Sequence, residues 1–438
     1  MYNCVVVALF AAVLAVIASA RNDLPKNREE RVSELQARAP APSLRFNYSG
    51  EKVRGVGIGG WLVIESFISP SIYDKTGDDR VIDEWSFAKY TPRRKAERIL
   101  RDHFDNFITE DDFREIKSYG LNHVRISFPY WGLRTYPGDP YLKLNQYDKL
   151  KEAAGWAKKH DIAMIIEVHT VPGGANGYDH GGRLNQTDWL GNDTNESRTI
   201  DLLRELSKEF SKDEYSTVTG ISLVNEPNGD RDKIYDFYKR AYDAVRNPAD
   251  GVTSPLMVVI GDAFQNPATS DYWNNKMNPP RFQNVMMDTH VYSIFDDNSV
   301  SQTLAQRIGY WCSLRDGFKK STKHLYQIVG EWSPAFTDCA PRVNGRFKGA
   351  RLDGKFPGSK YHASCRGKSG NSKNWSDEYK DQLRRSFDAQ SSSYEGGAGW
   401  IMWTWRTEHH NADDWSYRAG VRGGWIPRDP TDHRYPCK

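Results

Sequence analysis

The stretch at residues 221–227, ISLVNEP, decides how the fold of this 438-residue chain is interpreted. Its apolar residues predict a buried strand that ends at Asn225 and Glu226, because Pro227 cannot continue a simple strand ladder. An acid at the end of a buried strand indicates a chemical task, since burial penalises its charged form. A second apolar run at residues 325–331, LYQIVGE, ends in Glu331 in the same way.

Short β-branched runs alternate with longer amphipathic stretches along the rest of the chain. Eight strands separated by helices or long crossovers call for right-handed parallel connections. Eight repeats of strand then helix are typical of the α/β fold called the (β/α)8 TIM barrel, here as a single catalytic domain. The predicted strands are residues 53–58, 122–127, 163–168, 220–224, 256–260, 285–290, 326–330 and 399–403, and the predicted helices include 144–159, 198–210, 232–245, 300–319 and 377–392.

The N-terminal residues resemble a targeting segment. Residues 1–20, MYNCVVVALFAAVLAVIASA, predict a secretory signal peptide with a small-residue cleavage site. The alternative is a short membrane anchor, but no other stretch approaches the roughly 18 apolar residues that a span needs. Residues 21–42 are polar and end in alternating Ala and Pro, which predicts a propeptide or disordered leader. We therefore expect a catalytic domain at 43–438 in a secreted, extracellular protein that could associate with a cell wall.

The cysteines indicate the redox compartment of the protein, and its net charge limits the kinds of partner that it can bind. Four cysteines remain after Cys4 leaves with the signal, and an even number suits two disulfides in an oxidising compartment. Of the three pairings we favour Cys339–Cys365 within one loop and Cys312–Cys437 at the C-terminus. The net charge of +3, with basic residues spread among acidic ones, gives no sign of a nucleic-acid partner. Glycosylation sequons, in keeping with secretion, begin at Asn47, Asn185, Asn192, Asn195 and Asn374.

Polar and aromatic side chains recur where the predicted strands end, which is the edge where such barrels carry active sites. Each has a plainer interpretation on its own: Glu167 could pair with Arg125 as a structural ion pair, and the tryptophans could be packing. Their coincidence at one end of nearly every strand favours a shared site. In chain order they are Glu65, Arg125, Glu167, His169, Asn225, Glu226, His290, Tyr292, Glu331, Trp403 and Trp405.

Two strand-terminal glutamates suit the two-carboxylate chemistry of glycoside hydrolysis. One acid must be protonated at working pH, so its pKa should be raised, whereas the other must be ionised to attack the anomeric carbon. Arg125 and Tyr292 are natural partners for holding Glu331 ionised. Asn225 could donate a hydrogen bond to the sugar 2-hydroxyl, a contact that strengthens in the transition state.

The chain resembles glycoside hydrolase family 5, and within it the fungal exo-β-1,3-glucanases, from about residue 54 to residue 435. The resemblance is carried by RGVGIGGWLVIE at 54–65, LNHVRI at 121–126, NEP at 225–227, HVY at 290–292 and GEWS at 330–333. It implies a retaining mechanism with Glu226 as acid/base and Glu331 as nucleophile, and no metal or organic cofactor. It also implies that Glu65 binds glucose hydroxyls, and that the −1 subsite is lined by Arg125, His169, Asn225, His290, Tyr292 and Trp403.

The loop at residues 167–182 departs from the family pattern. Tyr178 stands where the family has an entrance phenylalanine, and Phe295 matches the partner of that residue, so the two resemble an aromatic clamp on the incoming glucan. His180 replaces an Asn beside the clamp, and Arg125 is followed by ISFPYW instead of the commoner IPIGYW. These changes affect the leaving-group side, so linkage preference and exo or endo mode stay open.

From this we expect a monomeric β-glucan hydrolase, without stable membrane insertion, that releases glucose from the non-reducing ends of β-1,3-glucans. One alternative is a β-1,6-glucanase or diglycosidase of the same family. An alternative of another class is a catalytically inactive carbohydrate-binding wall protein, against which the presence of both glutamates, Arg125 and Asn225 argues. The sequence leaves the physiological role and the pH optimum open.

Overall fold

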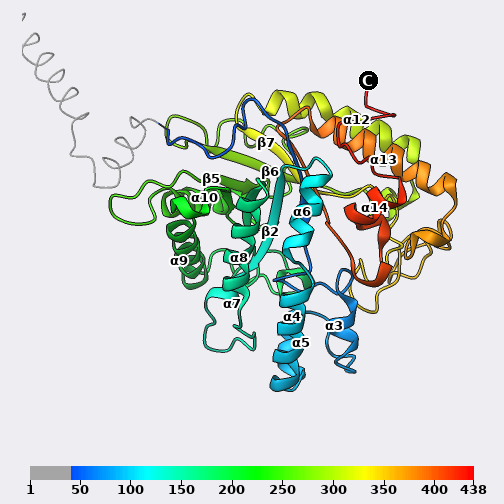
Figure 1. Cartoon of the computed structure of the whole chain (residues 1–438), viewed down its shortest axis with the longest axis horizontal. Coiled ribbons are helices and arrows are strands. Elements are labelled where there is room, and N and C mark those ends of the chain that lie inside the picture. Colours follow the sequence, from blue (N-terminus) through cyan, green and yellow to red (C-terminus); the bar gives the residue numbers. More distant parts are fainter. Residues whose placement is uncertain (1–40) are drawn as a thin grey trace, which may run out of the picture. The chain divides into compact units, whose positions relative to one another are not determined.

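The computed structural model describes residues 41–438 (Figure 1). The predicted signal peptide and almost all of the predicted leader lie outside these residues. Among the described residues, 42–276 and 284–438 form one compact unit that holds the barrel. Within 41–438, no helix has the length and apolar character needed to cross a membrane.

The described residues contain eight parallel strands that close into a barrel in chain order, with β1 hydrogen-bonded to both β2 and β8. This confirms the predicted (β/α)8 fold. The strands are β1 (Val53–Ile58), β2 (His123–Pro129), β3 (Ala163–Thr170), β4 (Val218–Ser222), β5 (Met257–Gly261), β6 (Val285–Val291), β7 (Tyr326–Trp332) and β8 (Gly399–Met402).

Several strand ends differ from the sequence prediction by one or two residues, and two of them, the ends of β4 and β7, carry the glutamates. Strand β4 ends at Ser222, two residues before the predicted end, and single main-chain bonds then guide the chain: Leu223 N–H donates to Val259 O, and Asn225 N–H donates to Val168 O. Strand β7 continues to Trp332, so Glu331 lies within the strand, where it pairs in register with His290 of β6. The register places these two side chains beside each other.

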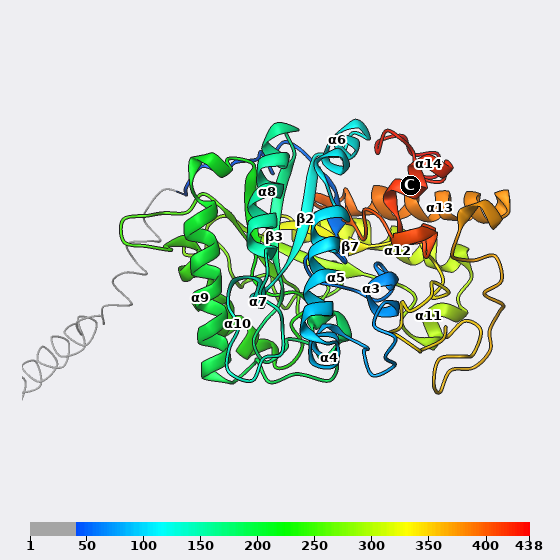
Figure 2. The same ribbon diagram turned by 60° about the horizontal axis from the view of Figure 1, so that its bottom comes forward.

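Helices surround the barrel, as Figures 1 and 2 show, and the neighbours α9 and α10, and α12 and α13, lie side by side. The predicted helix at 300–319 is wrong in one respect: it is two helices, because Thr303 caps a new helix by accepting a hydrogen bond from Gln306 N–H. The helices are α3 (Pro70–Asp74), α4 (Glu84–Tyr90), α5 (Arg93–Asn106), α6 (Glu110–Ser118), α7 (Tyr130–Leu133), α8 (Gln146–Lys159), α9 (Asp193–Phe210), α10 (Arg231–Arg246), α11 (Asp297–Ser301), α12 (Leu304–Ser321), α13 (Asp377–Tyr394) and α14 (Tyr417–Gly423), with short 3-10 turns that include η2 (Asp179–Gly181).

Apolar side chains fill the barrel towards the beginnings of the strands. Val53 and Met257 are the first residues of β1 and β5, and they pack with Ile165 and Ile328 in one buried cluster. Tyr48 joins this cluster and donates a hydrogen bond from its hydroxyl to Thr219 Oγ1 at 2.9 Å. Because this end is closed by apolar packing, the polar strand residues meet at the opposite, carboxyl end.

The two disulfides have the predicted pairing. Cys312 of α12 is bonded to Cys437, which ties down the C-terminal segment. Cys339 is bonded to Cys365 and closes part of the long connection between β7 and α13. One predicted sequon is a poor glycan acceptor, because the Asn195 side chain is buried and donates from Nδ2 to Asp188 O.

Candidate active site

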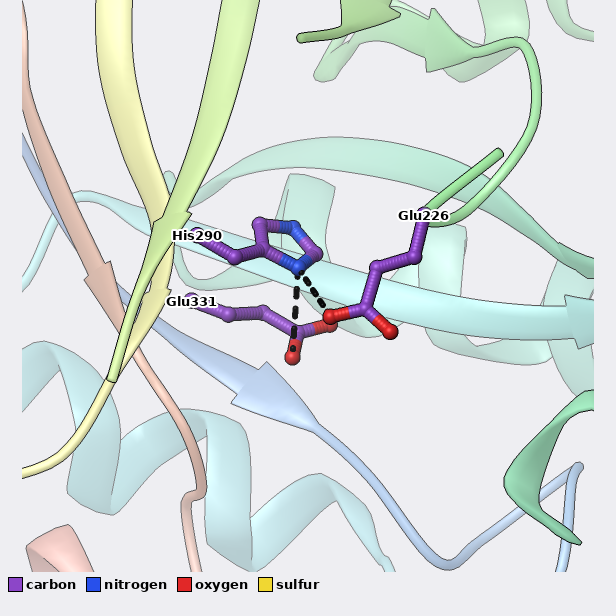
Figure 3. Close-up of side chains that lie close together, drawn as sticks. All are labelled: Glu226, His290 and Glu331. Carbon is purple, nitrogen blue, oxygen red and sulfur yellow. Dashed lines mark hydrogen bonds and ion pairs between the residues drawn. The ribbon is translucent and has the colours of Figure 1, made fainter. Parts of the chain in front are cut away.

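Glu226, His290 and Glu331 converge at the carboxyl end of the barrel (Figure 3). Glu226 follows β4, His290 lies on β6 and Glu331 lies on β7. One carboxylate oxygen from each glutamate and one imidazole nitrogen all lie within 4.8 Å of one another. The structure therefore brings together the two acids that the sequence singles out, with a histidine between them.

Glu226 has a backbone conformation that side chains rarely adopt. Its φ is +45°, in the left-handed region, directly before Pro227. Such a conformation costs on the order of 1–3 kcal/mol in a residue other than glycine and recurs at functional sites. The strained turn directs the Glu226 carboxyl towards His290, as Figure 3 shows.

The carboxylate of Glu331 is held on both oxygens. Arg125 Nη1 donates to Glu331 Oε1 at 2.7 Å, and the Tyr292 hydroxyl donates to Glu331 Oε2 at 3.0 Å. Both predicted partners thus contact Glu331. The guanidinium and the hydroxyl donor together fix the orientation of the carboxylate. The geometry suits an acid that must act as a nucleophile.

Arg125 links Glu331 to three further polar side chains of the barrel. Its Nη2 donates to Asn225 Oδ1 at 2.9 Å and lies 3.5 Å from Glu167 Oε1, and its Nε lies 3.7 Å from Asp288 Oδ2. The structural ion pair with Glu167 therefore exists alongside the contact to Glu331. Burial raises the pKa of Glu167, but the charges of Arg125 and His169 outweigh it and lower the pKa to about 2.

Asn225 has a donor left over. Its Oδ1 accepts from Arg125, while its buried Nδ2 has no hydrogen-bond partner among the described residues. Buried polar groups are normally satisfied, so an orphaned amide in a cluster of this kind calls for an explanation. A bound hydroxyl group would supply the missing acceptor, and the contact of Asn225 with the sugar 2-hydroxyl stays a prediction.

Glu65, His169 and Trp403 form one flank of the site. The rings of His169 and Trp403 lie nearly parallel, with centroids 6.0 Å apart and an interplanar angle of 4°. Burial raises the pKa of Glu65 to about 8, and the nearby charge of His169 offsets part of this rise. Trp405, by contrast, points its Nε1 to Asp112 Oδ1 of α6 at 2.9 Å, so the plain packing interpretation holds for it.

The electrostatics around Glu226 contradict the raised pKa that the sequence analysis predicts for a proton donor. His290 Nδ1 lies 2.8 Å from Glu226 Oε1. Burial raises the pKa of Glu226, but the hydrogen bond from His290 and its charge lower it to about 2. Burial lowers the pKa of His290, yet the charges of Glu331 and Asp288 raise it well above its ordinary value. Both shifts favour an ionised Glu226 carboxylate beside a protonated His290 imidazole.

Tyr178 and Phe295 are both partly exposed, at 43% and 41% of their surface. The Tyr178 ring lies 5.4 Å from that of His180, and the Phe295 ring lies 5.4 Å from that of Tyr292. Tyr178 lies in the loop after β3 and Phe295 in the loop after β6, so the two rings border the site from two different loops. Exposed aromatic rings in such positions suit stacking on the apolar faces of sugars.

A family model described as Cellulase (glycosyl hydrolase family 5) matches residues 94–341, more than half of the chain. The chain belongs to glycosyl hydrolase family 5. This confirms the predicted family and makes the protein an enzyme of the class that acts on O-glycosyl bonds.

Relatives within family 5 match over most of the chain. It is 38% identical over 403 residues to a glucan 1,3-beta-glucosidase of Yarrowia lipolytica, covering 90% of this chain and 92% of that protein. It is also 38% identical over 400 residues to a glucan 1,3-beta-glucosidase of Blumeria graminis, covering 89% and 90%. The crystal structure of rutinosidase from Aspergillus niger superposes with a TM-score of 0.65 at 19% identity, over 87% of this chain and 99% of that one, which shows a common fold.

One residue of this family 5 site escapes the sequence analysis. Asp288 lies in the middle of β6, where its Oδ1 accepts from Gly330 N–H at 2.8 Å and its Oδ2 lies 3.6 Å from His290 Nε2. The signal was the single acid in the otherwise apolar run VMMD at 285–288. The sequence analysis selected polar residues at the ends of strands, and Asp288 lies inside one.

Among the described residues, Glu226, His290 and Glu331 are spaced so that one cation could bind all three. Two carboxylates and an imidazole are ligands that Zn²⁺ accepts. However, the Arg125 guanidinium already occupies Glu331 Oε1, and a fixed positive charge so close disfavours a cation. These three side chains are therefore better suited to exchanging a proton than to binding a metal ion.

Proposed function

We propose that this chain is a retaining exo-β-1,3-glucanase that releases glucose from the non-reducing ends of β-1,3-glucans, with Glu226 as acid/base and Glu331 as nucleophile. The observation that carries the proposal is that one carboxylate oxygen of Glu226, one of Glu331 and one ring nitrogen of His290 all lie within 4.8 Å of one another. Retaining glycosidases hold their carboxyl groups roughly 5–5.5 Å apart, whereas inverting ones leave about 6.5–9.5 Å for a water molecule.

In the first step, Glu331 attacks the anomeric carbon while Glu226 gives a proton to the departing oxygen. The resting proton lies on His290, so the Glu226 carboxyl must gain it before the leaving oxygen can take it. Because His290 Nδ1 stays 2.8 Å from Glu226 Oε1, the acidic proton is carried on Oε2. A sugar that fills the site removes water, which penalises the separated charges of this pair and favours the neutral form of both. Substrate binding thereby favours the protonated form of Glu226, which can act as an acid.

In the second step, Glu226 takes a proton from water, which attacks the glycosyl–Glu331 ester and frees glucose with retained configuration. His290 again accompanies Glu226, now favouring the carboxylate that must act as base. A sugar hydroxyl can replace this water, so we expect transglycosylation as a side reaction.

The other residues of the site are assigned to sugar binding. Asn225 offers its free Nδ2 to the 2-hydroxyl, where a hydrogen bond strengthens in the transition state. Glu65 and His169 provide polar contacts to the remaining hydroxyls, and Trp403 provides an apolar wall. The Arg125, His290 and Tyr292 side chains hold the two acids, while Tyr178 and Phe295 border the entrance as a clamp.

The substrate class is supported by the relatives named glucan 1,3-beta-glucosidase. The altered loop at 167–182 keeps a β-1,6-glucanase or diglycosidase activity as the second candidate. Initial rates on laminarin, pustulan and an aryl rutinoside separate these, and we expect laminarin to be the best substrate. Anomeric NMR of the first product should show β-glucose. A rate on pustulan far above that on laminarin would contradict the proposed β-1,3 specificity.

We further propose that the protein is secreted as a monomeric glycoprotein. Support comes from the predicted signal peptide, the two disulfides and the exposed sequon residues Asn47, Asn185 and Asn374. Cleavage at residue 20 should appear in the N-terminal sequence of material recovered from culture medium. Glycosidase treatment followed by mass spectrometry should find glycans at exposed sequons and none at Asn195, and size-exclusion chromatography reports the oligomeric state.

A further inference from the structure

His180 lies beside the free oxygen of Glu226. It belongs to the short turn η2 in the loop that departs from the family pattern, and its Nε2 lies 3.5 Å from Glu226 Oε2. The other oxygen, Glu226 Oε1, is bound by His290 Nδ1 at 2.8 Å. Each oxygen of the carboxyl therefore faces a different imidazole. His180 precedes β4 in the sequence, and His290 follows it.

The loop fixes the position of His180 through its backbone. Gly182 N–H donates to Asp179 O at 3.1 Å, and Trp85 N–H donates to Gly182 O at 2.9 Å, which binds the turn to helix α4. The centroid of the His180 ring lies 5.3 Å from that of His169 and 5.4 Å from that of Tyr178. These contacts restrain the ring, and 26% of the His180 side chain remains exposed to solvent.

The two ring nitrogens of His180 have different surroundings. Its Nδ1 is buried and has no hydrogen-bond partner within residues 41–438, so Nε2 is the nitrogen that meets a polar group of the protein. The distance of 3.5 Å is long for a hydrogen bond, but catalytic contacts of this kind shorten when substrate binds. Because Oε1 is engaged by His290, Oε2 is the oxygen left to pass a proton to the leaving sugar.

We propose that His180 is a positioning residue for Glu226, which holds the proton-donating oxygen Oε2 towards the leaving group. The inference rests on the proposed role of Glu226 as acid/base. An Asn, the residue that the related pattern has here, could also donate a hydrogen bond but could not carry a charge. His180 thus adds a titratable partner on the leaving-group side of the site.

The charges around His180 decide the sign of its effect. Glu226 faces it from the segment after β4, His169 from β3, and Asp179 from its own turn, while His290 lies across the Glu226 carboxyl. The charge of Lys348, in the loop after β7, acts on Asp179. A positive charge or donor on His180 stabilises ionised Glu226, so removing it should raise the pKa of the acid.

The experiment compares His180→Ala and His180→Asn on aryl β-glucosides whose leaving groups range from dinitrophenol to phenol. We expect kcat/KM of His180→Ala to fall about tenfold for phenol and less than about twofold for dinitrophenol, since only poor leaving groups need a well-placed acid. His180→Asn should recover most of the loss. In His180→Ala, which has neither the charge nor the donor, the alkaline limb of kcat/KM should move up by about half a pH unit, and in His180→Asn, which keeps a donor, it should move less.

Two controls keep the outcomes distinct. Arg183→Ala changes the same loop, but this side chain stacks on Trp85 at 4.1 Å, so the dependence on leaving group should stay that of the unmodified chain. Glu226→Ala should steepen the dependence strongly and be rescued by azide with activated substrates; if it does neither, the proposed function fails. If Glu226→Ala behaves as expected while His180→Ala slows all aryl glucosides equally, or leaves the alkaline limb unmoved, the inference about His180 is overturned.

Discussion

Arg125 of β2 and Glu331 of β7 form a buried charge pair, with Nη1 and Oε1 2.7 Å apart and side-chain exposures of 1% and 7%. The same guanidinium donates to Asn225 through Nη2. Two contacts in fixed directions need the planar fork of arginine, which a lysine ammonium cannot reproduce. This pair positions the proposed nucleophile and the proposed 2-hydroxyl contact with one side chain.

Arg125→Lys should therefore lower kcat on laminarin by about 100-fold while the fold is kept, because a misplaced nucleophile loses orientation. Arg125→Met should also cost about 3–5 kcal/mol of unfolding free energy, since it strips the counter-charge from buried carboxylates. Steady-state rates and denaturant unfolding measure the two effects. Arg80→Lys, at an exposed ion pair with Asp78, is the matched control and should change neither. Unmodified turnover in Arg125→Lys would contradict the proposed role.

Gly57 of β1 leaves the space that the Trp403 ring occupies. A Cβ at this position would lie 2.5 Å from Trp403 Cε3 and 2.9 Å from Cζ3, closer than atoms can approach. Gly57→Ala should cost about 1–3 kcal/mol of stability from overpacking. It should also raise KM, because Trp403 must shift away from its place beside His169.

Gly155→Ala provides the matched control for this substitution. Gly155 is exposed on helix α8, and an added Cβ would meet nothing within 4 Å. Alanine favours a helix over glycine, so this variant should gain about 0.5–1 kcal/mol. Thermal and denaturant unfolding report both signs. Equal effects at the two positions would show that the space beside Trp403 does not decide the outcome.

The buried pair of His169 and Glu167 should make stability depend on pH, and the sign follows from the two shifts. Burial lowers the pKa of His169, but the charge and hydrogen bond of Glu167 raise it to about 9, above its ordinary 6.5. Its contribution is therefore complete below pH 6.5 and lost as pH rises through about 9. Glu167 has a pKa lowered from 4.5 to about 2, so its contribution is complete above pH 4.5 and lost as pH falls through about 2.

We expect His169→Asn to destabilise the protein most between pH 4.5 and 6.5, where both groups are charged. The difference in unfolding free energy between the variant and the unmodified chain should shrink towards pH 9. Denaturant unfolding at three pH values across this range measures it. A difference that does not change with pH would mean that His169 contributes through packing alone.

The sequence predicts the barrel and the meeting of the acids well because both follow from local patterns. An apolar run that stops at an acid identifies Glu226 and Glu331 without knowledge of their neighbours. The direction of the Glu226 pKa could not be predicted, because it depends on His290, 64 residues away in the chain. Likewise, a continuous amphipathic pattern hides the break before Thr303, which only the capping bond reveals.

The two disulfides should differ in how much they stabilise the fold. Cys312 and Cys437 are 125 residues apart in sequence, and Cys339 and Cys365 are 26 apart. A longer closed loop removes more entropy from the unfolded chain, and the chain-entropy relation predicts a difference of about 1.4 kcal/mol between the two bonds. Replacing the Cys312–Cys437 pair by alanines should therefore lower the unfolding free energy more than replacing the Cys339–Cys365 pair. Denaturant midpoints with matched slopes test this order. If the shorter loop proves the more stabilising, contacts of the connection between β7 and α13, and not loop length, determine the effect.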